Sequence, residues 1–142
     1  MQTEPMIMPQ SPCASRHVFV YGTLRRGGRN DIARFDPPAR FVGAASVAGT
    51  LYDLGSYPGA VLGGDGVLTG EVYAIDPALE AQLDVLEGVR PDDSGEYIKR
   101  ELRVRVGALE IDCLVYEIHP SRIVGRPAIT SGNWLDRAPP FS

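Results

Sequence analysis

The chain has 142 residues, of which 44% are hydrophobic and 23% charged, and its formal net charge is −4. This length suits one domain with a substantial core, and the composition is that of an ordinary globular protein. Lys and Arg are scattered among acidic residues, so no basic face for nucleic acid is expected. No apolar run approaches the roughly 20 residues that a membrane helix needs, so no membrane partner is expected either.

The two ends of the chain differ in composition from the rest. Residues 1–15 are predicted to form a disordered N-terminal tail, 16–137 the folded domain and 138–142 a shorter C-terminal tail. The first segment lacks the basic start and apolar middle of a secretory signal. Two cysteines, Cys13 and Cys113, are too few for a disulfide framework or a zinc knuckle. We therefore expect a cytoplasmic protein in which Cys113, inside an apolar strand, is buried.

Glycine and proline divide the first half of the chain into short pieces. The pattern predicts a strand over 18–21, a short helical turn over 30–35, and a strand over 41–54 interrupted by two glycines. Residues 60–62 and 67–75 flank Gly63-Gly64-Asp65-Gly66, which is typical of a hairpin.

The second half begins with the clearest helix signal. Asp76 can cap a helix in which Pro77 takes the first position, and Gly88 is placed to end it. Strands are predicted over 98–106 and 111–118, and the second is apolar on both faces, which indicates a central strand. The sum is a single α+β domain: a mixed, curled or barrel-like sheet with one main helix packed against it.

A polar, glycine-bearing turn follows the first strand, in Tyr21-Gly22-Thr23-Leu24-Arg25-Arg26-Gly27-Gly28-Arg29-Asn30. Such a turn can present backbone N–H groups, unpaired by any sheet, to a carboxylate or a developing oxyanion. Its glycine spacing approaches that of a phosphate loop, but Gly28-Arg29 stands where Lys and then Ser or Thr are required. The two histidines, His17 and His119, have no accompanying ligand cluster. No nucleotide, other cofactor or metal ion is therefore expected.

Glu87 is the candidate for acid–base chemistry. It lies at the border of the apolar stripe of Leu79, Leu83 and Leu86, whereas a projection at 100° per residue turns Asp84 away from that stripe. It also occupies the last turn, where the helix dipole disfavours an anion by about 0.3–1 kcal/mol. Burial and dipole together would raise the pKa of its carboxyl toward neutrality, which suits a general base. The alternative is a border glutamate that is solvated or paired with Arg90 or Arg100.

Other charged residues have structural interpretations. Glu71, within a strand, is expected to point inward and pair across strands. Arg25, Arg26 and Arg29 could hold a substrate carboxylate, but at least two of the three are expected to form an exposed rim. Five of the tyrosines and Trp134 are assigned mostly to the core: Tyr52, Tyr57, Tyr73, Tyr97 and Tyr116.

The residues from Val18 to Trp134 resemble the γ-glutamylcyclotransferase-like superfamily, in particular its small bacterial γ-glutamylamine cyclotransferase-like branch. The resemblance rests on motifs in the family's order: Val18-Phe19-Val20-Tyr21-Gly22-Thr23-Leu24-Arg25, Gly49-Thr50-Leu51-Tyr52-Asp53-Leu54-Gly55, Tyr57-Pro58, Gly70-Glu71-Val72-Tyr73, Leu83-Asp84-Val85-Leu86-Glu87-Gly88, Tyr97 and Ser131-Gly132-Asn133-Trp134. Residues 89–96 form a longer segment than the family pattern, and Lys99 stands where an arginine is common.

This resemblance implies that Glu87 is the catalytic acid/base and that Tyr21, Gly22, Thr23 and Leu24 bind the substrate. The implied reaction is the cyclisation of a γ-glutamyl amide or peptide to 5-oxoproline, with release of an amine or amino acid and without a cofactor. Two alternatives stay open: a non-catalytic binding or regulatory module with the same cavity, and an amidohydrolase. The expected partner is a small γ-glutamyl molecule, and the chain is expected to be a monomer or homodimer.

Overall fold

The computed structural model describes residues 16–90 and 94–134. The two predicted tails, 1–15 and 138–142, and with them Cys13, lie outside these residues. In chain order the elements are β1 (Arg16–Val20), a 3-10 helix (Ile32–Arg34), β2 (Arg40–Asp53), β3 (Pro58–Ile75), α1 (Pro77–Leu86), β4 (Tyr97–Val106), β5 (Leu109–Ile118), a second 3-10 helix (Pro120–Arg122) and β6 (Ala128–Ile129).

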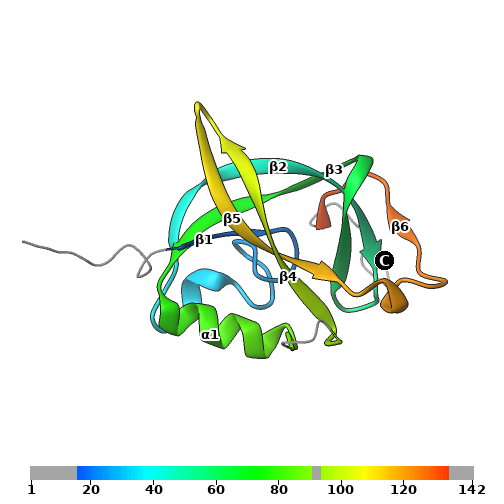
Figure 1. Ribbon diagram of the computed structural model, residues 1–142, viewed down its shortest axis with the longest axis horizontal. Helices are drawn as coiled ribbons and strands as arrows, with labels where there is room; N and C mark the ends of the chain where they lie inside the picture. The colour runs from blue at the N-terminus through cyan, green and yellow to red at the C-terminus, as the bar shows by residue number, and fades with distance from the viewer. Residues whose placement is uncertain (1–15, 91–93, 135–142) are drawn as a thin grey trace, which may run out of the picture.

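The strands form one sheet in the order β4-β5-β1-β3-β2-β6. Neighbours are antiparallel, except that β1 runs parallel to β5. This confirms a mixed sheet with one main helix, and it confirms that β5 lies inside the sheet. The sheet curls strongly, with α1 along one side and the tip of the β4–β5 hairpin projecting beyond the rest of the molecule (Figure 1).

The curl brings β4 across to β2, but the sheet does not close into a barrel. At the point of approach a Cβ on Gly43 would lie only 2.6 Å from Val106 Cγ1. Within the described residues β4 and β6 remain the edges of the sheet, because no strand pairing joins them. The expected barrel-like sheet is therefore a curled, open one.

The curled sheet separates two apolar cores. On the inner side Phe19 and Tyr21 of the first strand region join Val72, Val115 and Trp134. On the other side Val18 and Val20 pack with Leu79 and Leu83 of α1. Because β1 is buried on both faces, its end is held rigidly, and the turn that follows it starts from a fixed point.

The predicted hairpin at 63–66 is wrong. Both halves of the segment belong to β3 and pair with β2, and the register passes directly from Ala48↔Val67 to Gly49↔Leu62. The four residues 63–66 therefore form a bulge in one strand. The hairpin lies earlier, where Asp53 pairs with Pro58, because β2 is long enough to pair with the whole of β3.

Candidate functional site

A cavity of about 210 Å³ opens beside the end of β1. It is formed by the end of β1 and the turn after it, the start of β3 and the residue before it, the C-terminal end of α1, the start of β4 and one residue of β5. Its lining contains all five residues predicted for the site, together with residues that were not: Phe19, Val20, Tyr21, Gly22, Thr23, Leu24, Arg29, Asn30, Tyr57, Pro58, Leu86, Glu87, Glu96, Tyr97 and Tyr116. The structure thus brings the predicted turn and the predicted carboxylate into one cavity.

The turn is folded by its own backbone. The N–H of Arg25 donates to Gly22 O at 3.1 Å and the N–H of Asn30 to Thr23 O at 2.9 Å. By contrast, the N–H groups of Gly22, Thr23 and Leu24 donate to no acceptor among the described residues. These three adjacent donors belong to cavity-lining residues, as anion binding would require.

Gly22 is required by the opposite wall of the cavity. A Cβ at this position would lie 2.6 Å from Pro58 Cγ. A larger side chain would therefore push the turn away from the start of β3, and only glycine allows this close approach.

A buried ion pair holds the far end of the turn. Arg25 Nε donates to Glu71 Oε2 at 2.8 Å, and the other Glu71 oxygen accepts the N–H of Arg26 at 2.9 Å and the hydroxyl of Tyr73 at 3.1 Å. Arg25 Nη1 also donates to Asn133 Oδ1 at 2.6 Å. The inward, cross-strand pairing predicted for Glu71 is confirmed, and Arg25 is a buried structural residue rather than part of a rim.

The other two arginines of the turn are exposed, as predicted for at least two of the three. The guanidinium carbon of Arg26 lies 4.4 Å from the centroid of the Phe41 ring, a cation–π contact. Arg29 lines the cavity and is its only Lys or Arg in the described part of the chain.

Local helix signals place Glu87. The Asp76 carboxylate accepts the N–H of Leu79 at 2.9 Å, and α1 begins at Pro77 as predicted. Glu87 is the C-cap, and Gly88 follows with φ +64°. The N–H of Gly88 bonds to Val85 O and that of Val89 to Asp84 O, the two bonds of a Schellman motif. Glu87 is therefore fixed at a closed helix end.

The surroundings of Glu87 favour its neutral form. Desolvation by burial, and next the negative charge of Glu96, raise the pKa of its carboxyl to about 7. Among the described residues none donates a hydrogen bond to this carboxylate, and Arg100 pairs with Glu117 at 2.8 Å instead. The alternative of a Glu87 paired with Arg90 or Arg100 is therefore wrong.

Two expectations about α1 need correction. Asp84 does not face away: its Oδ1 accepts the hydroxyl of Tyr116 at 2.7 Å, and its Oδ2 accepts Lys99 Nζ at 2.8 Å. Leu86, assigned to the apolar stripe, is 43% exposed and lies at the cavity lining. A projection of the helix alone could not show that Tyr116 of β5 and Lys99 of β4 donate hydrogen bonds to Asp84.

Tyr97 and Tyr116, which were assigned to the core, are buried and also form the cavity wall, together with Tyr21, which was predicted to bind the substrate. The hydroxyl of Tyr21 donates to Tyr116 O at 2.6 Å, and that of Tyr97 to Pro58 O at 2.6 Å. Burial raises the pKa of Tyr21, Tyr97 and Tyr116, and the charge of Glu87 raises all three further. The wall therefore stays uncharged at neutral pH and surrounds Glu87.

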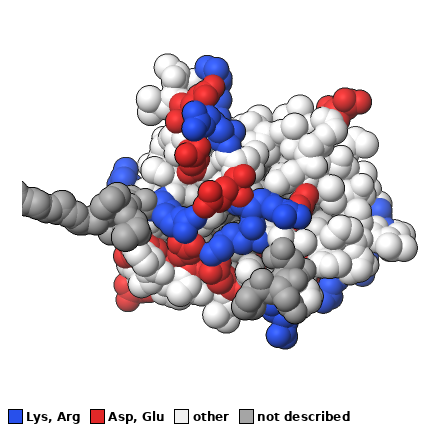
Figure 2. All heavy atoms as spheres, in the orientation of Figure 1, with Lys and Arg blue, Asp and Glu red and all other residues white. Residues whose placement is uncertain are grey.

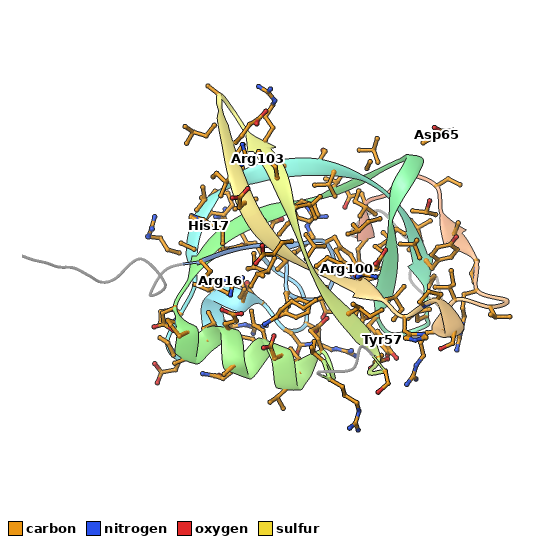
Figure 3. The ribbon with its side chains drawn as sticks, in the orientation of Figure 1. Arg16, His17, Tyr57, Asp65, Arg100 and Arg103 are labelled. Atoms are coloured by element: carbon orange, nitrogen blue, oxygen red, sulfur yellow. The ribbon has the colours of Figure 1, made fainter. Side chains whose placement is uncertain are left out.

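A second carboxylate in the cavity, Glu96, was not predicted. Its Oε2 accepts a short hydrogen bond from the hydroxyl of Tyr57. Figure 3 shows Tyr57 beside the start of β4, far from Arg103 near the tip of the β4–β5 hairpin. The only signal in the sequence was the position of Glu96 directly before Tyr97, a residue of the family motif.

Many charged residues outside the cavity form ion pairs on the surface of the β4–β5 hairpin. Figure 2 shows Lys and Arg interleaved with Asp and Glu over the face that carries β4 and β5. The pairs include Arg16–Glu101, Arg103–Asp112 and Arg105–Glu110. Surface pairs of this kind contribute little to stability individually.

Comparison with known proteins identifies the family. Residues 18–136 match the family described as "Gamma-glutamyl cyclotransferase, AIG2-like". The chain belongs to this γ-glutamylcyclotransferase family. It is 38% identical over 121 residues to "Gamma-glutamylcyclotransferase family protein ytfP" of Citrobacter rodentium and 37% identical to the YtfP protein of Escherichia coli K12, covering 84% of this chain and 96% of each relative.

Solved structures of the γ-glutamylcyclotransferase family share the fold. A crystal structure of an AIG2-like protein from Mus musculus has a TM-score of 0.67 at 28% identity, covering 83% of this chain and 88% of that one. The solution structure of E. coli ytfP has a TM-score of 0.60 at 36% identity, covering 84% and 96%. The resemblance seen in the sequence motifs and the curled α+β fold are thereby confirmed.

Two further observations concern the described residues. No helix among them is both long and apolar enough to cross a membrane. They also contain no group of three or more His, Cys, Asp or Glu side chains that could bind a metal ion. Cys113 is buried, as predicted, and burial raises the pKa of its thiol to about 11.

Proposed function

We propose that this protein catalyses the cyclisation of a γ-glutamyl amide or peptide to 5-oxoproline, with release of an amine or amino acid. The observation that carries the proposal is one cavity that contains Glu87, with a pKa near 7, and the unpaired N–H groups of Gly22, Thr23 and Leu24. Family membership supports the same reaction.

The reaction needs little besides positioning and proton transfer. The α-amine of the substrate attacks its own γ-carbonyl carbon, so nucleophile and electrophile belong to one molecule. Glu87, as carboxylate, accepts a proton from the α-ammonium group and frees its electron pair. A carboxyl with a pKa near 7 can accept this proton at neutral pH and give it up again.

Attack places negative charge on the γ-oxygen. Unpaired backbone donors are suited to this oxyanion or to the α-carboxylate, and they need no reorganisation when the charge develops. The protonated Glu87 then donates to the leaving nitrogen as the carbon–nitrogen bond breaks. Of the three α-ammonium hydrogens, one remains on the lactam nitrogen. Glu87 passes the other two to the leaving nitrogen, one after the other, so the released amine departs as an ammonium ion.

The test is a panel of γ-glutamyl dipeptides and γ-glutamylamines, with 5-oxoproline as the measured product. We expect turnover of at least one substrate class and a loss of about 10²–10⁴-fold in kcat for Glu87→Gln, the range for a general acid–base group. Glu110→Gln, the same change on the exposed hairpin, is the matched control. Free glutamate as the product would instead identify an amidohydrolase, and binding without any product would identify a binding module.

A further inference from the structure

Glu96 and Glu87 share the cavity without a compensating cation. Both line it, and the charge of Glu96 acts on Glu87 directly. Among the described residues neither carboxylate forms an ion pair, although most acidic side chains of the hairpin do. Two carboxylates that share a site repel each other, and a cation placed between them relieves that repulsion.

Glu96 is held in a defined position. Its N–H donates to Gly88 O at 3.2 Å, and its carbonyl accepts the N–H of His119 at 2.9 Å. Tyr57 donates to Oε2, whereas Oε1 receives no hydrogen bond from any described residue. The side chain is thus anchored through one oxygen and keeps the other available for a ligand.

The charges around this pair do not supply the missing cation. Arg29 lines the cavity but forms no ion pair with Glu96 or Glu87 in the described part of the chain. The hydrogen bond to Glu96 raises the pKa of the Tyr57 hydroxyl, and the charges of Arg122 and Arg126 lower it by a smaller amount. Neither arginine lines the cavity. No side chain of the described residues therefore supplies a cation to the two carboxylates, and a cationic group on a ligand would fill this role.

We propose that Glu96, oriented by Tyr57, binds the α-ammonium group of the substrate and holds it beside Glu87. This inference rests on the proposed function, because a γ-glutamyl compound is the ligand that carries this cation next to the reacting atoms. An ammonium group has three donors, so it can bond Oε1 of Glu96 and the Glu87 carboxylate together. Glu96 then selects for a free α-amine, and Glu87 removes the proton from it.

The experiment compares two ligands that differ only in the α-ammonium group, L-glutamine and glutaramate (the monoamide of glutaric acid). Their affinities are measured by calorimetry at about pH 8, where the carboxyl of Glu87 is largely ionised. In the wild type we expect glutamine to bind at least about tenfold more tightly, the effect of one hydrogen-bonded charge pair. In Glu96→Gln this ratio should fall several-fold, because only Glu87 is left to attract the ammonium group, and in Tyr57→Phe it should fall by a smaller factor.

Two further variants complete the design. Glu101→Gln, the same change on the exposed part of β4, should keep the wild-type ratio. The proposal is overturned if Glu96→Gln keeps the ratio while Glu87→Gln abolishes it, or if the wild type shows no preference for glutamine. 5-Oxoproline is measured in the same samples. A preference that depends on Glu96 without any 5-oxoproline formation from γ-glutamyl substrates would leave the binding role standing and contradict the cyclisation.

Discussion

The hydroxyl of Tyr116 donates a hydrogen bond to Asp84 Oδ1 at 2.7 Å, which ties the cavity wall on β5 to the helix that ends at Glu87. Asp84 lies three residues before Glu87, and its other oxygen accepts Lys99 Nζ from β4 at 2.8 Å. The end of α1 is therefore fixed against two strands, not only by its apolar face.

Removing this hydroxyl should loosen the end of the helix. Tyr116→Phe keeps the ring but leaves Asp84 with Lys99 alone, and a hydrogen bond to a charged group contributes about 1.5–3 kcal/mol. We expect a loss of about that size in the free energy of unfolding, measured by urea denaturation, and a several-fold lower kcat/KM. Tyr52→Phe is the control, because no described residue bonds the Tyr52 hydroxyl. Equal stability of the two variants would contradict the role of Tyr116.

The pH dependence of activity should report Glu87. A base that works as carboxylate with a pKa of about 7 gives a kcat/KM that rises with pH and is half-maximal near pH 7. Because Glu96 is one of the two causes of this pKa, Glu96→Gln should move the half-maximum to lower pH, whereas Glu110→Gln should not move it. A wild-type profile already flat at about pH 5 would contradict the assignment.

The same carboxyl should affect stability with a definite sign. Its pKa in the folded protein, about 7, lies above the ordinary value of 4.5, so the folded state binds more protons between these two pH values. Stability from this group is therefore present below pH 4.5 and lost as the pH rises through 7. We compare the free energy of unfolding of Glu87→Gln with that of the wild type at pH 4 and at pH 8. Between these two pH values the difference should shift by about 1–3 kcal/mol in favour of the variant. A difference that does not change with pH would exclude a raised pKa.

Local signals in the sequence were sufficient for the helix and for the turn. Asp76, Pro77 and Gly88 each act within a few residues of their own position, so the bounds of α1 and the place of Glu87 could be predicted. The unpaired donors of the turn follow in the same way from a strand that ends at a glycine. Family motifs then indicated that turn and carboxylate meet, which no local signal could do.

The predictions that were wrong, and the site residue that was missed, concern features that depend on contacts between segments distant in the sequence. The glycines at 63–66 look like a hairpin, and only the pairing of β2 with both halves of β3 makes them a bulge. Glu96 reaches the cavity because its N–H bonds to Gly88 O across a loop, and Asp84 turns inward because Tyr116 is 32 residues away in the chain but adjacent in space. Such long-range bonds leave no periodic pattern in the sequence.

Gly22 should tolerate no side chain. The Cβ of Gly22→Ala would meet Pro58 Cγ at 2.6 Å, so the turn and its three donors must shift. We expect a loss of about 1–3 kcal/mol in the free energy of unfolding, as for overpacking elsewhere, and at least about tenfold in kcat/KM. Pro58→Ala removes the opposing atom, and the double variant should recover part of both losses. A double variant as impaired as Gly22→Ala would exclude this clash as the cause.

The buried pair behind the turn should matter more than any surface pair. Glu71→Gln keeps the shape of the side chain but removes the negative charge opposite Arg25, whose guanidinium then stays buried without a counter-charge among the described residues. Breaking a buried pair in this way costs about 3–5 kcal/mol. Glu110→Gln, at an exposed pair with Arg105, should cost at most about 1 kcal/mol. Urea denaturation gives both values.

The Glu71 variant should also separate binding from chemistry. Glu71 touches the turn at Arg25 and Arg26, beyond the three unpaired donors, and it does not line the cavity. A less rigid turn should bind the substrate more weakly, so KM should rise by a larger factor than kcat falls. The pH at which kcat/KM is half-maximal should stay near that of the wild type. A shifted pH profile with unchanged KM would mean that Glu71 acts on Glu87 and not on the turn.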